Sequence, residues 1–258
     1  MGAGPQALID GGLVSRLEQR GHSVRRVVID APVGQWRAEI RTAFDLAKAL
    51  AVSIRTARSA GRFPLVLSGN CSAALGVCAA LGAETNVVWA DAHGDFNTPE
   101  TTIGGFLDGM ALATLTGHCW KQLASQIPGF SSMREDHVWL LGARDLDPLE
   151  LEALSRSAIH RLSAQSINAA SAARVADALA PSAPLYLHFD VDVLDPSAGR
   201  ANTFATPDGV TRDDLAAFYE SLAARVPPAA ITVSAYDPEV DADGMARESV
   251  FRVLDRLL

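Results

Sequence analysis

Residues 88–99 read VWADAHGDFNTP, in which a run of hydrophobic residues passes directly into Asp91, His93 and Asp95. Residues 185–196, LYLHFDVDVLDP, repeat this layout with two further aspartates. Each apolar run has the length and the β-branched and aromatic content of a buried strand. Buried strands that end in polar residues are typical of a parallel sheet, in which ligands bind outside the carboxyl ends of the strands.

Short β-branched or aromatic runs alternate with longer stretches rich in Ala, Leu and Arg along the chain. The predicted strands are residues 24–29, 64–68, 86–90, 137–141, 158–162, 184–190 and 230–235. The predicted helices are residues 36–60, 72–82, 106–117, 148–155, 166–180, 211–225 and 244–257. Because this alternation repeats strand–helix–strand units, it predicts an α/β fold with a mainly parallel sheet and helices on both faces.

The composition limits the class of protein. A chain of 258 residues, with 48% hydrophobic and 20% charged residues and no low-complexity tract, predicts one compact domain over residues 1–258. The net charge of -8 argues against nucleic acid as a partner. Three cysteines that match no disulfide or zinc framework indicate a reducing compartment, so we expect a cytoplasmic protein. The sequence shows no signal peptide and no apolar run that could span a membrane.

The acidic residues after the two strands form a candidate metal site. Alternate side chains of an extended chain point the same way, so Asp91, His93 and Asp95 are expected to converge with Asp190 and Asp192. Four carboxylates in one cleft repel each other unless cations neutralise them. Carboxylates with an imidazole suit divalent Mn, Zn, Co, Ni or Fe better than Ca. The alternative is that these aspartates only cap helices or form turns.

The segments ADAHGDFNTPETT (residues 90–102) and FDVDVLDP (residues 189–196) resemble the metal-binding signatures of the arginase/agmatinase (ureohydrolase) family. The similarity extends to the loops at residues 69–72 and 142–145 and through most of the chain. The resemblance implies a three-layer αβα fold, a homo-oligomer, and hydrolysis of a guanidine or amidine C–N bond in a small-molecule substrate. It also implies that the first strand of the family is missing here.

The resemblance also implies the metal ligands. Asp91 and Asp190 would bridge two metal ions, Asp95 would bind the first ion, and His93 and Asp192 would bind the second. The expected cofactor is a divalent metal, one or two ions, with manganese first and zinc, iron or nickel as alternatives.

Three positions depart from the family pattern. Cys71 stands where the family has a histidine ligand of the first metal, Asp108 where arginases have a histidine thought to move protons, and Ala235 where a glutamate holds the guanidinium. Cys71 is either a metal ligand or a buried small hydrophobe. A ligating thiolate would leave the cluster at a charge of about -1 and shift its preference from Mn toward Zn or Fe.

Four further residues have two readings each. Asp108, which with Asp95 is a candidate catalytic residue, is either a helix-start acid or a proton shuttle. Asn97 and Asp147 occupy positions where the family contacts the amino-acid end of the substrate; the alternative is hydrogen bonding between loops. His188 is either a core histidine with one hydrogen bond or an outer partner of a ligating carboxylate.

We therefore expect a metal-dependent hydrolase of a guanidine, amidine or related group. Arginine itself is not the expected substrate, because the sequence lacks both the guanidinium-binding glutamate and the shuttle histidine. One alternative is an arginase-fold pseudoenzyme with an impaired metal site that serves as a binding or subunit protein. The other is a one-metal, deacetylase-like amide hydrolase, because Asp91, His93 and Asp192 resemble the zinc ligands of the histone deacetylase fold.

Overall fold

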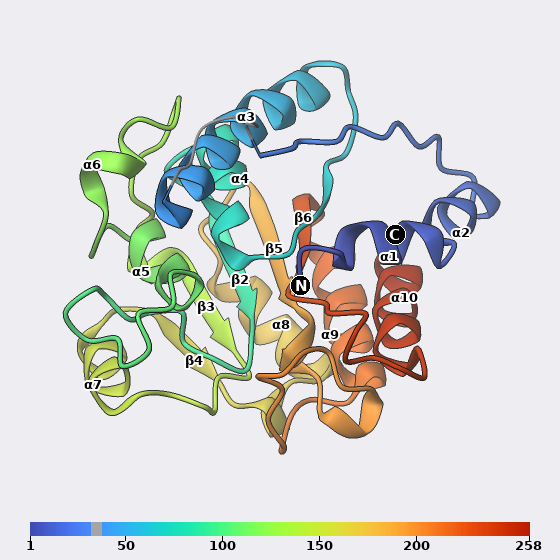
Figure 1. The fold of residues 1–258 in the computed structure, drawn as a ribbon. Helices are drawn as coiled ribbons and strands as arrows, with labels where there is room; N and C mark the ends of the chain where they lie inside the picture. The colour runs from blue at the N-terminus through green and yellow to red at the C-terminus, as the bar shows by residue number, and fades with distance from the viewer. Residues whose placement is uncertain (32–37) are drawn as a thin grey trace.

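The structure, a computed structural model, describes residues 1–31 and 38–258. At its centre is a six-stranded sheet with the order β1-β6-β5-β2-β3-β4, in which every pair of neighbours is parallel (Figure 1). The strands are β1 (Leu65–Leu67), β2 (Asn86–Ala90), β3 (Val138–Leu141), β4 (His160–Leu162), β5 (Leu185–Asp190) and β6 (Pro228–Ser234). The predicted α/β fold with a parallel sheet is confirmed.

The register of the central strands brings their carboxyl ends to one edge of the sheet. In β2 and β5, Trp89 pairs with His188 and Ala90 pairs with Phe189. In β5 and β6, Asp190 pairs with Ser234. The residues that follow these three strands are therefore neighbours in space, although they are far apart in the sequence.

Helices cover both faces of the sheet, giving the three-layer αβα arrangement (Figure 1). Val87, Trp89 and Tyr186 pack with α3, α4 and α5, whereas Val88 and Leu187 point to the other face, which α1, α2, α8, α9 and α10 cover. The alternation follows from the period of two in a strand. The helices are α1 (Gly4–Asp10), α2 (Leu13–Gln19), α3 (Glu39–Ser59), α4 (Ala74–Leu81), α5 (Ala111–Leu115), α6 (Lys121–Ala124), α7 (Pro148–Arg156), α8 (Ala169–Ala178), α9 (Arg212–Arg225) and α10 (Met245–Leu257).

Short 3₁₀ turns lie next to several of these elements. They are η1 (Cys71–Ala73), η2 (Asp108–Met110), η3 (Glu135–His137), η4 (Ala164–Ser166), η5 (Val191–Val193) and η6 (Pro196–Ala198). Three of them, η1, η2 and η5, include predicted site residues. Among the described residues, no helix is both long enough and apolar enough to cross a lipid bilayer.

Six of the seven predicted strands form, and one prediction is wrong. Residues 24–29 form no strand, and Val27 and Val28 are 60% and 69% exposed. A β-rich composition does not suffice, because a strand also needs a neighbour with which to exchange hydrogen bonds. All seven predicted helices have a counterpart; α3 begins at Glu39, and residues 36 and 37 of that prediction lie outside the described residues. Three helices, α1, α2 and α6, were not predicted.

Candidate metal centre

Tight turns follow β2 and β5, where the sequence predicted extended chain. After β2, the Asp91 carboxylate accepts a hydrogen bond from the backbone N–H of His93 at 2.7 Å, and Asp95 has a φ of 48°, in the left-handed region. After β5, the carboxylate of Asp190 accepts from the backbone N–H of Asp192 at 2.9 Å, and the chain enters η5. The expectation of alternate side chains along extended chain is therefore wrong. The turns gather the acidic residues instead.

His93 lies between two of the acidic side chains. Its Nδ1 is 3.3 Å from Asp91 Oδ1 and 3.5 Å from Asp192 Oδ2. The potential ligand atoms of these three residues all lie within 4.8 Å of one another. An imidazole and two carboxylates at this spacing are a plausible donor set for a divalent transition metal.

Cys71 belongs to a second group of potential ligands, which also includes Asp91. Its thiol donates a hydrogen bond to Asp190 Oδ2 at 2.9 Å, and its Sγ is 3.3 Å from the hydroxyl oxygen of Ser234. Cys71, Asp91 and His188 form a second group whose potential ligand atoms lie within 4.8 Å of one another. Two possible metal-binding groups therefore share Asp91.

Asp95 provides a test of whether a cation fits here. Its side chain is only 6% exposed, and its Oδ2 has no hydrogen-bond partner among the described residues. Burial and the charges of Asp91, Asp108 and Asp190 raise the pKa of its carboxyl well above the ordinary range. A buried carboxylate oxygen without a partner is costly, and a bound cation would remove that cost. The donor set therefore fits a divalent metal.

The electrostatics of the cluster show an excess of negative charge. Burial and neighbouring aspartates raise the pKa of Asp190 and Asp192. Burial alone would raise the pKa of Asp91 as well, but the hydrogen bond and the charge of His93 outweigh burial, and the pKa of Asp91 is lowered. Burial alone would lower the pKa of His93, yet Asp91 and Asp192 raise it to about 9. Burial and then the charge of Asp190 raise the pKa of the Cys71 thiol.

Asp108 holds the loop that carries Cys71. Its Oδ2 accepts from the side-chain amide of Asn70 at 3.1 Å and from the backbone N–H of Cys71 at 2.9 Å, and its Oδ1 accepts from the backbone N–H of Ser72 at 2.9 Å. Burial raises its pKa to about 6. These contacts agree with an acid at the start of a helix, here the η1–α4 segment. A role in proton transfer stays a prediction.

Asn97 and Asp147 lie together and contact each other. The Asn97 amide donates to Asp147 Oδ2 at 3.0 Å, and the Thr101 hydroxyl donates to Asn97 Oδ1 at 2.9 Å. Asp147 also caps α7 in a reciprocal pair with Glu150. Both residues therefore connect loops, as in the alternative reading. Their contact with a substrate stays a prediction.

His188 is buried and has a partner on each ring nitrogen. Nδ1 is 2.9 Å from the Tyr186 hydroxyl, and Nε2 is 3.1 Å from the Ser234 hydroxyl. Its ring stacks on Trp89 with the centroids 3.7 Å apart. Burial lowers its pKa to about 3, so the imidazole is neutral. From the sequence we expected a core histidine with one hydrogen bond, whereas the ring of His188 has two.

Ala235 lies at the site without supplying a carboxylate. It is 4% exposed and has a φ of 60°, which is unusual for a residue other than glycine. The side-chain amide of Asn202 donates to the Ala235 carbonyl at 2.9 Å and to Asp192 Oδ2 at 3.1 Å. Asn202 therefore connects the β6 end to the β5 end.

Three residues of the centre were missed in the sequence. Asn202 and Ser234 give no sequence signal, because their roles depend on contacts between different strands and loops. Arg144 lies in the loop at residues 142–145, which the family resemblance did mark. Its guanidinium donates to the carbonyls of Asp192 at 3.0 Å and Thr206 at 2.8 Å, and so holds the segment after β5 in place.

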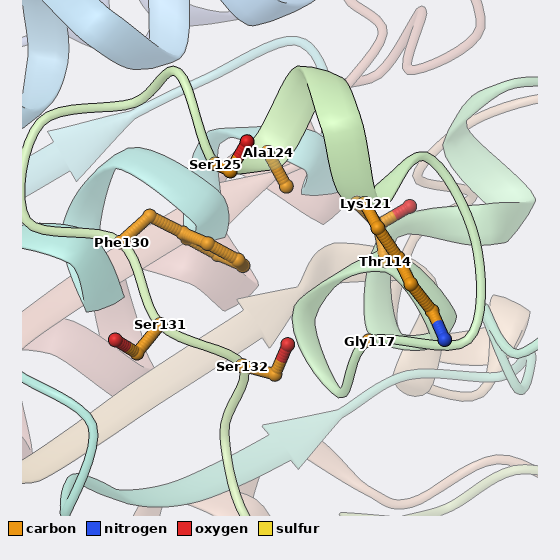
Figure 2. Close-up of a pocket in the computed structure, with 8 residues that line it drawn as sticks. All are labelled: Thr114, Gly117, Lys121, Ala124, Ser125, Phe130, Ser131 and Ser132. Carbon is orange, nitrogen blue, oxygen red and sulfur yellow. The ribbon is translucent and has the colours of Figure 1, made fainter.

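A shallow hollow of about 170 Å³ lies elsewhere, near α5 and α6 (Figure 2). None of the predicted metal ligands or catalytic residues lines it, and its polar groups are hydroxyls and one lysine. Its lining residues are Thr114, Gly117, Lys121, Ala124, Ser125, Phe130, Ser131 and Ser132. This hollow is therefore separate from the acidic cluster.

Comparisons with known proteins agree with the fold and identify the family. The model of the Arginase family matches residues 3–258. The arginase of Neurospora crassa is 32% identical over 225 residues, which is 75% of this chain but only 62% of that protein. The N(omega)-hydroxy-L-arginine amidinohydrolase of Streptomyces lavendulae is 31% identical over 62% of this chain and 56% of that protein. The solved structure of the Bacillus subtilis arginase superposes with a TM-score of 0.89 at 24% identity, covering 99% of this chain and 91% of that one. The chain therefore belongs to the arginase family.

Proposed function

We propose that this protein is a metal-dependent hydrolase that cleaves a C–N bond in a guanidine, amidine or related group. The observation that carries the proposal is the cluster of Asp91, His93 and Asp192, whose ligand atoms lie within 4.8 Å of one another. This cluster occurs in a member of the arginase family, at the carboxyl ends of the two central strands.

The residues around the cluster have separable tasks in this proposal. Bound divalent cations would supply Lewis-acid activation of a water molecule and neutralise the carboxylates. Asp91, His93 and Asp192 would hold a cation, and Arg144 fixes the segment that carries Asp192. Because the pKa of Asp108 is raised to about 6, part of this carboxyl is protonated near neutral pH. We assign to it the delivery of a proton to the leaving amine.

We further propose that arginine and agmatine are poor substrates. Ala235 offers only a methyl group where a carboxylate could pair with a guanidinium, and it is buried at the end of β6. Asn97 and Asp147 are hydrogen-bonded to each other, so part of their capacity to bind a free amino acid is already used. Substituted guanidines, hydroxyguanidines and formimino compounds are the better candidates.

Several finer features belong to the same proposal. We propose manganese as the first metal to test, with zinc, iron or nickel as alternatives. We also propose one domain over residues 1–258, assembly into a homo-oligomer and a cytoplasmic location.

Metal analysis followed by a substrate panel tests the function. Protein purified without chelator should contain one or two divalent ions per chain, and at least one member of a guanidine and amidine panel should release urea or ammonia. Asp192→Asn should lose a metal and reduce turnover about a hundredfold or more. Asp195→Asn is the control, because Asp195 lies three residues along the same loop and its carboxylate accepts hydrogen bonds from Ser197 and Gly209.

A different result would favour the pseudoenzyme. Protein that neither retains nor takes up a divalent metal, and that turns over no member of the panel, would contradict the proposed function. Efficient turnover of arginine would contradict the substrate proposal alone.

A further inference from the structure

Two exposed aromatic side chains from different loops, the aromatic pair, lie together beside the candidate metal centre. Phe106, in the loop before η2, and Phe204, in the loop between η6 and α9, are 41% and 48% exposed. Their rings stack with the centroids 5.4 Å apart and an interplanar angle of 25°. Single exposed hydrophobic residues are ordinary in proteins, whereas two stacked rings form a continuous apolar surface of the kind that binds a ligand.

Phe204 also borders the accessible side of the acidic cluster. Its ring is nearly perpendicular to the imidazole of His93, with the centroids 6.5 Å apart and an interplanar angle of 87°. The side chains of Asp91 and Asp192 are buried, whereas that of His93 is 27% exposed. The part of this group that solvent reaches is therefore the His93 side, where the aromatic pair lies.

The loop that carries Phe204 is fixed on both sides of the ring. The backbone N–H of Phe204 donates to Asn202 Oδ1 at 2.8 Å, and the Asn202 amide donates to Asp192 Oδ2 at 3.1 Å. Two residues after Phe204, the Thr206 carbonyl accepts a hydrogen bond from Arg144 at 2.8 Å. The position of the ring is therefore tied to the same aspartate that belongs to the metal centre.

The loop that carries Phe106 is fixed in a similar way. Two residues after Phe106, the Asp108 carboxylate accepts a hydrogen bond from the backbone N–H of Cys71 at 2.9 Å. On the other side, the backbone N–H of Gly105 donates to the Thr102 hydroxyl at 3.0 Å. Because both loops are already ordered, a ligand that binds the aromatic pair avoids much of the entropy cost of arranging it.

We infer that the aromatic pair is a subsite for a flat apolar substituent, such as an aryl group, on the guanidine or amidine that the metal centre receives. Aromatic rings pack favourably at centroid distances of about 4.5–7 Å. The separation of Phe204 and His93 lies in this range, so a ring joined to a guanidine by a short linker can contact Phe204 while the guanidine lies next to His93. A charged substituent would lose hydration there without gaining a hydrogen bond, because neither phenyl ring offers one.

This inference rests on the proposed function and names the substrate class for the same site, but it is tested by binding and not by turnover. Protein purified without chelator is titrated by calorimetry with benzylguanidine, n-butylguanidine and γ-guanidinobutyrate. These probes share the guanidine and differ in carrying an aromatic, an aliphatic and a charged substituent. Benzylguanidine should bind about tenfold more tightly than n-butylguanidine, and γ-guanidinobutyrate should bind most weakly.

Variants of the aromatic pair separate stacking from general apolar contact. Phe204→Ala and Phe106→Ala should each lower the affinity for benzylguanidine about tenfold and that for n-butylguanidine about threefold at most. Phe204→Leu keeps apolar area without a ring, so it should bind these two probes about equally. Phe63→Ala is the matched control and should leave all affinities unchanged. Phe63 is 43% exposed and precedes the amino end of β1, at the opposite edge of the sheet from the metal centre.

The results separate this inference from the proposed function. Equal affinities for benzylguanidine and n-butylguanidine, a preference for γ-guanidinobutyrate, or an aromatic preference that survives both alanine variants would overturn the inference. So would the absence of benzylguanidine binding. Protein that keeps its metal and turns over a guanidine without an aromatic preference would retain the proposed function and lack this subsite. Benzylguanidine binding that depends on Phe204 and Phe106 in protein without metal or turnover would support the subsite and contradict the function.

Discussion

Replacing Asp95 by asparagine should have opposite effects with and without metal. Asp95→Asn removes one negative charge and keeps the shape of the side chain. Asparagine also tolerates the left-handed backbone conformation that residue 95 adopts, with a φ of 48°. The variant therefore changes the charge of the cluster without adding backbone strain.

The expected gain in the metal-free protein follows from the surroundings of Asp95. Two like charges about 5 Å apart at an effective dielectric of about 20 repel by about 3 kcal/mol. A buried oxygen without a partner adds a cost of about 1–3 kcal/mol. Burial and neighbouring aspartates raise the pKa of Asp95, so proton uptake already relieves part of this cost. We therefore expect a net stabilisation of about 2 kcal/mol, or an increase in Tm of about 4–8 °C for a chain of this size.

The metal-loaded protein should respond in the opposite direction. Without the carboxylate, metal affinity should fall by at least the factor of about 10–100 that is typical of losing an outer partner of a metal ligand. Metal binding stabilises the folded protein by RT ln(1 + [metal]/Kd), so the Tm rises with the logarithm of the free metal concentration above Kd. Thermal unfolding of chelator-treated protein, repeated across a Mn²⁺ or Zn²⁺ titration, should show a higher starting Tm and a smaller metal-induced increase.

Asp241→Asn provides a matched control. Asp241 is also 6% exposed, but the Tyr236 hydroxyl and the backbone N–H groups of Ala246 and Arg247 donate to its carboxylate, each at 2.9 Å. The same chemical change should therefore destabilise the protein by about 1–3 kcal/mol, with or without metal. If Asp95→Asn lowers the Tm of the metal-free protein as Asp241→Asn does, the view that Asp95 carries an uncompensated charge is wrong.

Three further results are expected. The pKa of Asp108 in the folded protein is about 6, above the ordinary 3.8, so protonated Asp108 contributes about 3 kcal/mol to the free energy of unfolding below pH 3.8, and this contribution is lost as the pH rises through 6. Urea unfolding of metal-free protein at several pH values should show this loss, and Asp108→Asn should lack it. Ala235→Gly should raise the free energy of unfolding by up to about 1 kcal/mol, because glycine adopts a φ of 60° without strain. The control Ala230→Gly, inside β6, should lower the free energy of unfolding by about 1 kcal/mol in the same denaturant assay. Cys71→His should bind an additional Mn²⁺ or shift its preference from Zn²⁺ toward Mn²⁺ in a mixed-metal competition; a folded variant that does neither would show that residue 71 does not contact the metal.

The sequence was most informative where the chain is buried on both sides. The central strands β2 and β5 consist mostly of apolar residues, and the aspartates at and after their ends could be placed at one edge because parallel strands share their direction. The same reasoning gave a false strand at residues 24–29, where the composition favours a strand but none of the strands in the described part of the chain pairs with it. Pairing is a property of the whole fold, so a local window cannot predict it.

The details of the site depended on contacts that no local pattern encodes. Asp91 and Asp190 each accept a hydrogen bond from the backbone two residues onward, which bends the chain where alternation predicted extension. Asn202 connects Asp192 to the Ala235 carbonyl across two loops, and nothing in its own sequence neighbourhood distinguishes it. The residue types were therefore predictable, whereas the geometry that joins them was not.

Trp89 gives the centre a built-in optical reporter. Its indole N–H donates to Asp91 Oδ2 at 3.1 Å while its ring stacks on His188, so one chromophore contacts a residue of each metal group. Its fluorescence should change when Asp91 or His188 exchanges a hydrogen bond for a cation, and a paramagnetic ion such as Co²⁺ should quench it more than Zn²⁺. Occupancy of the site could then be followed in solution by emission, with Trp89→Phe as the reference that removes this signal.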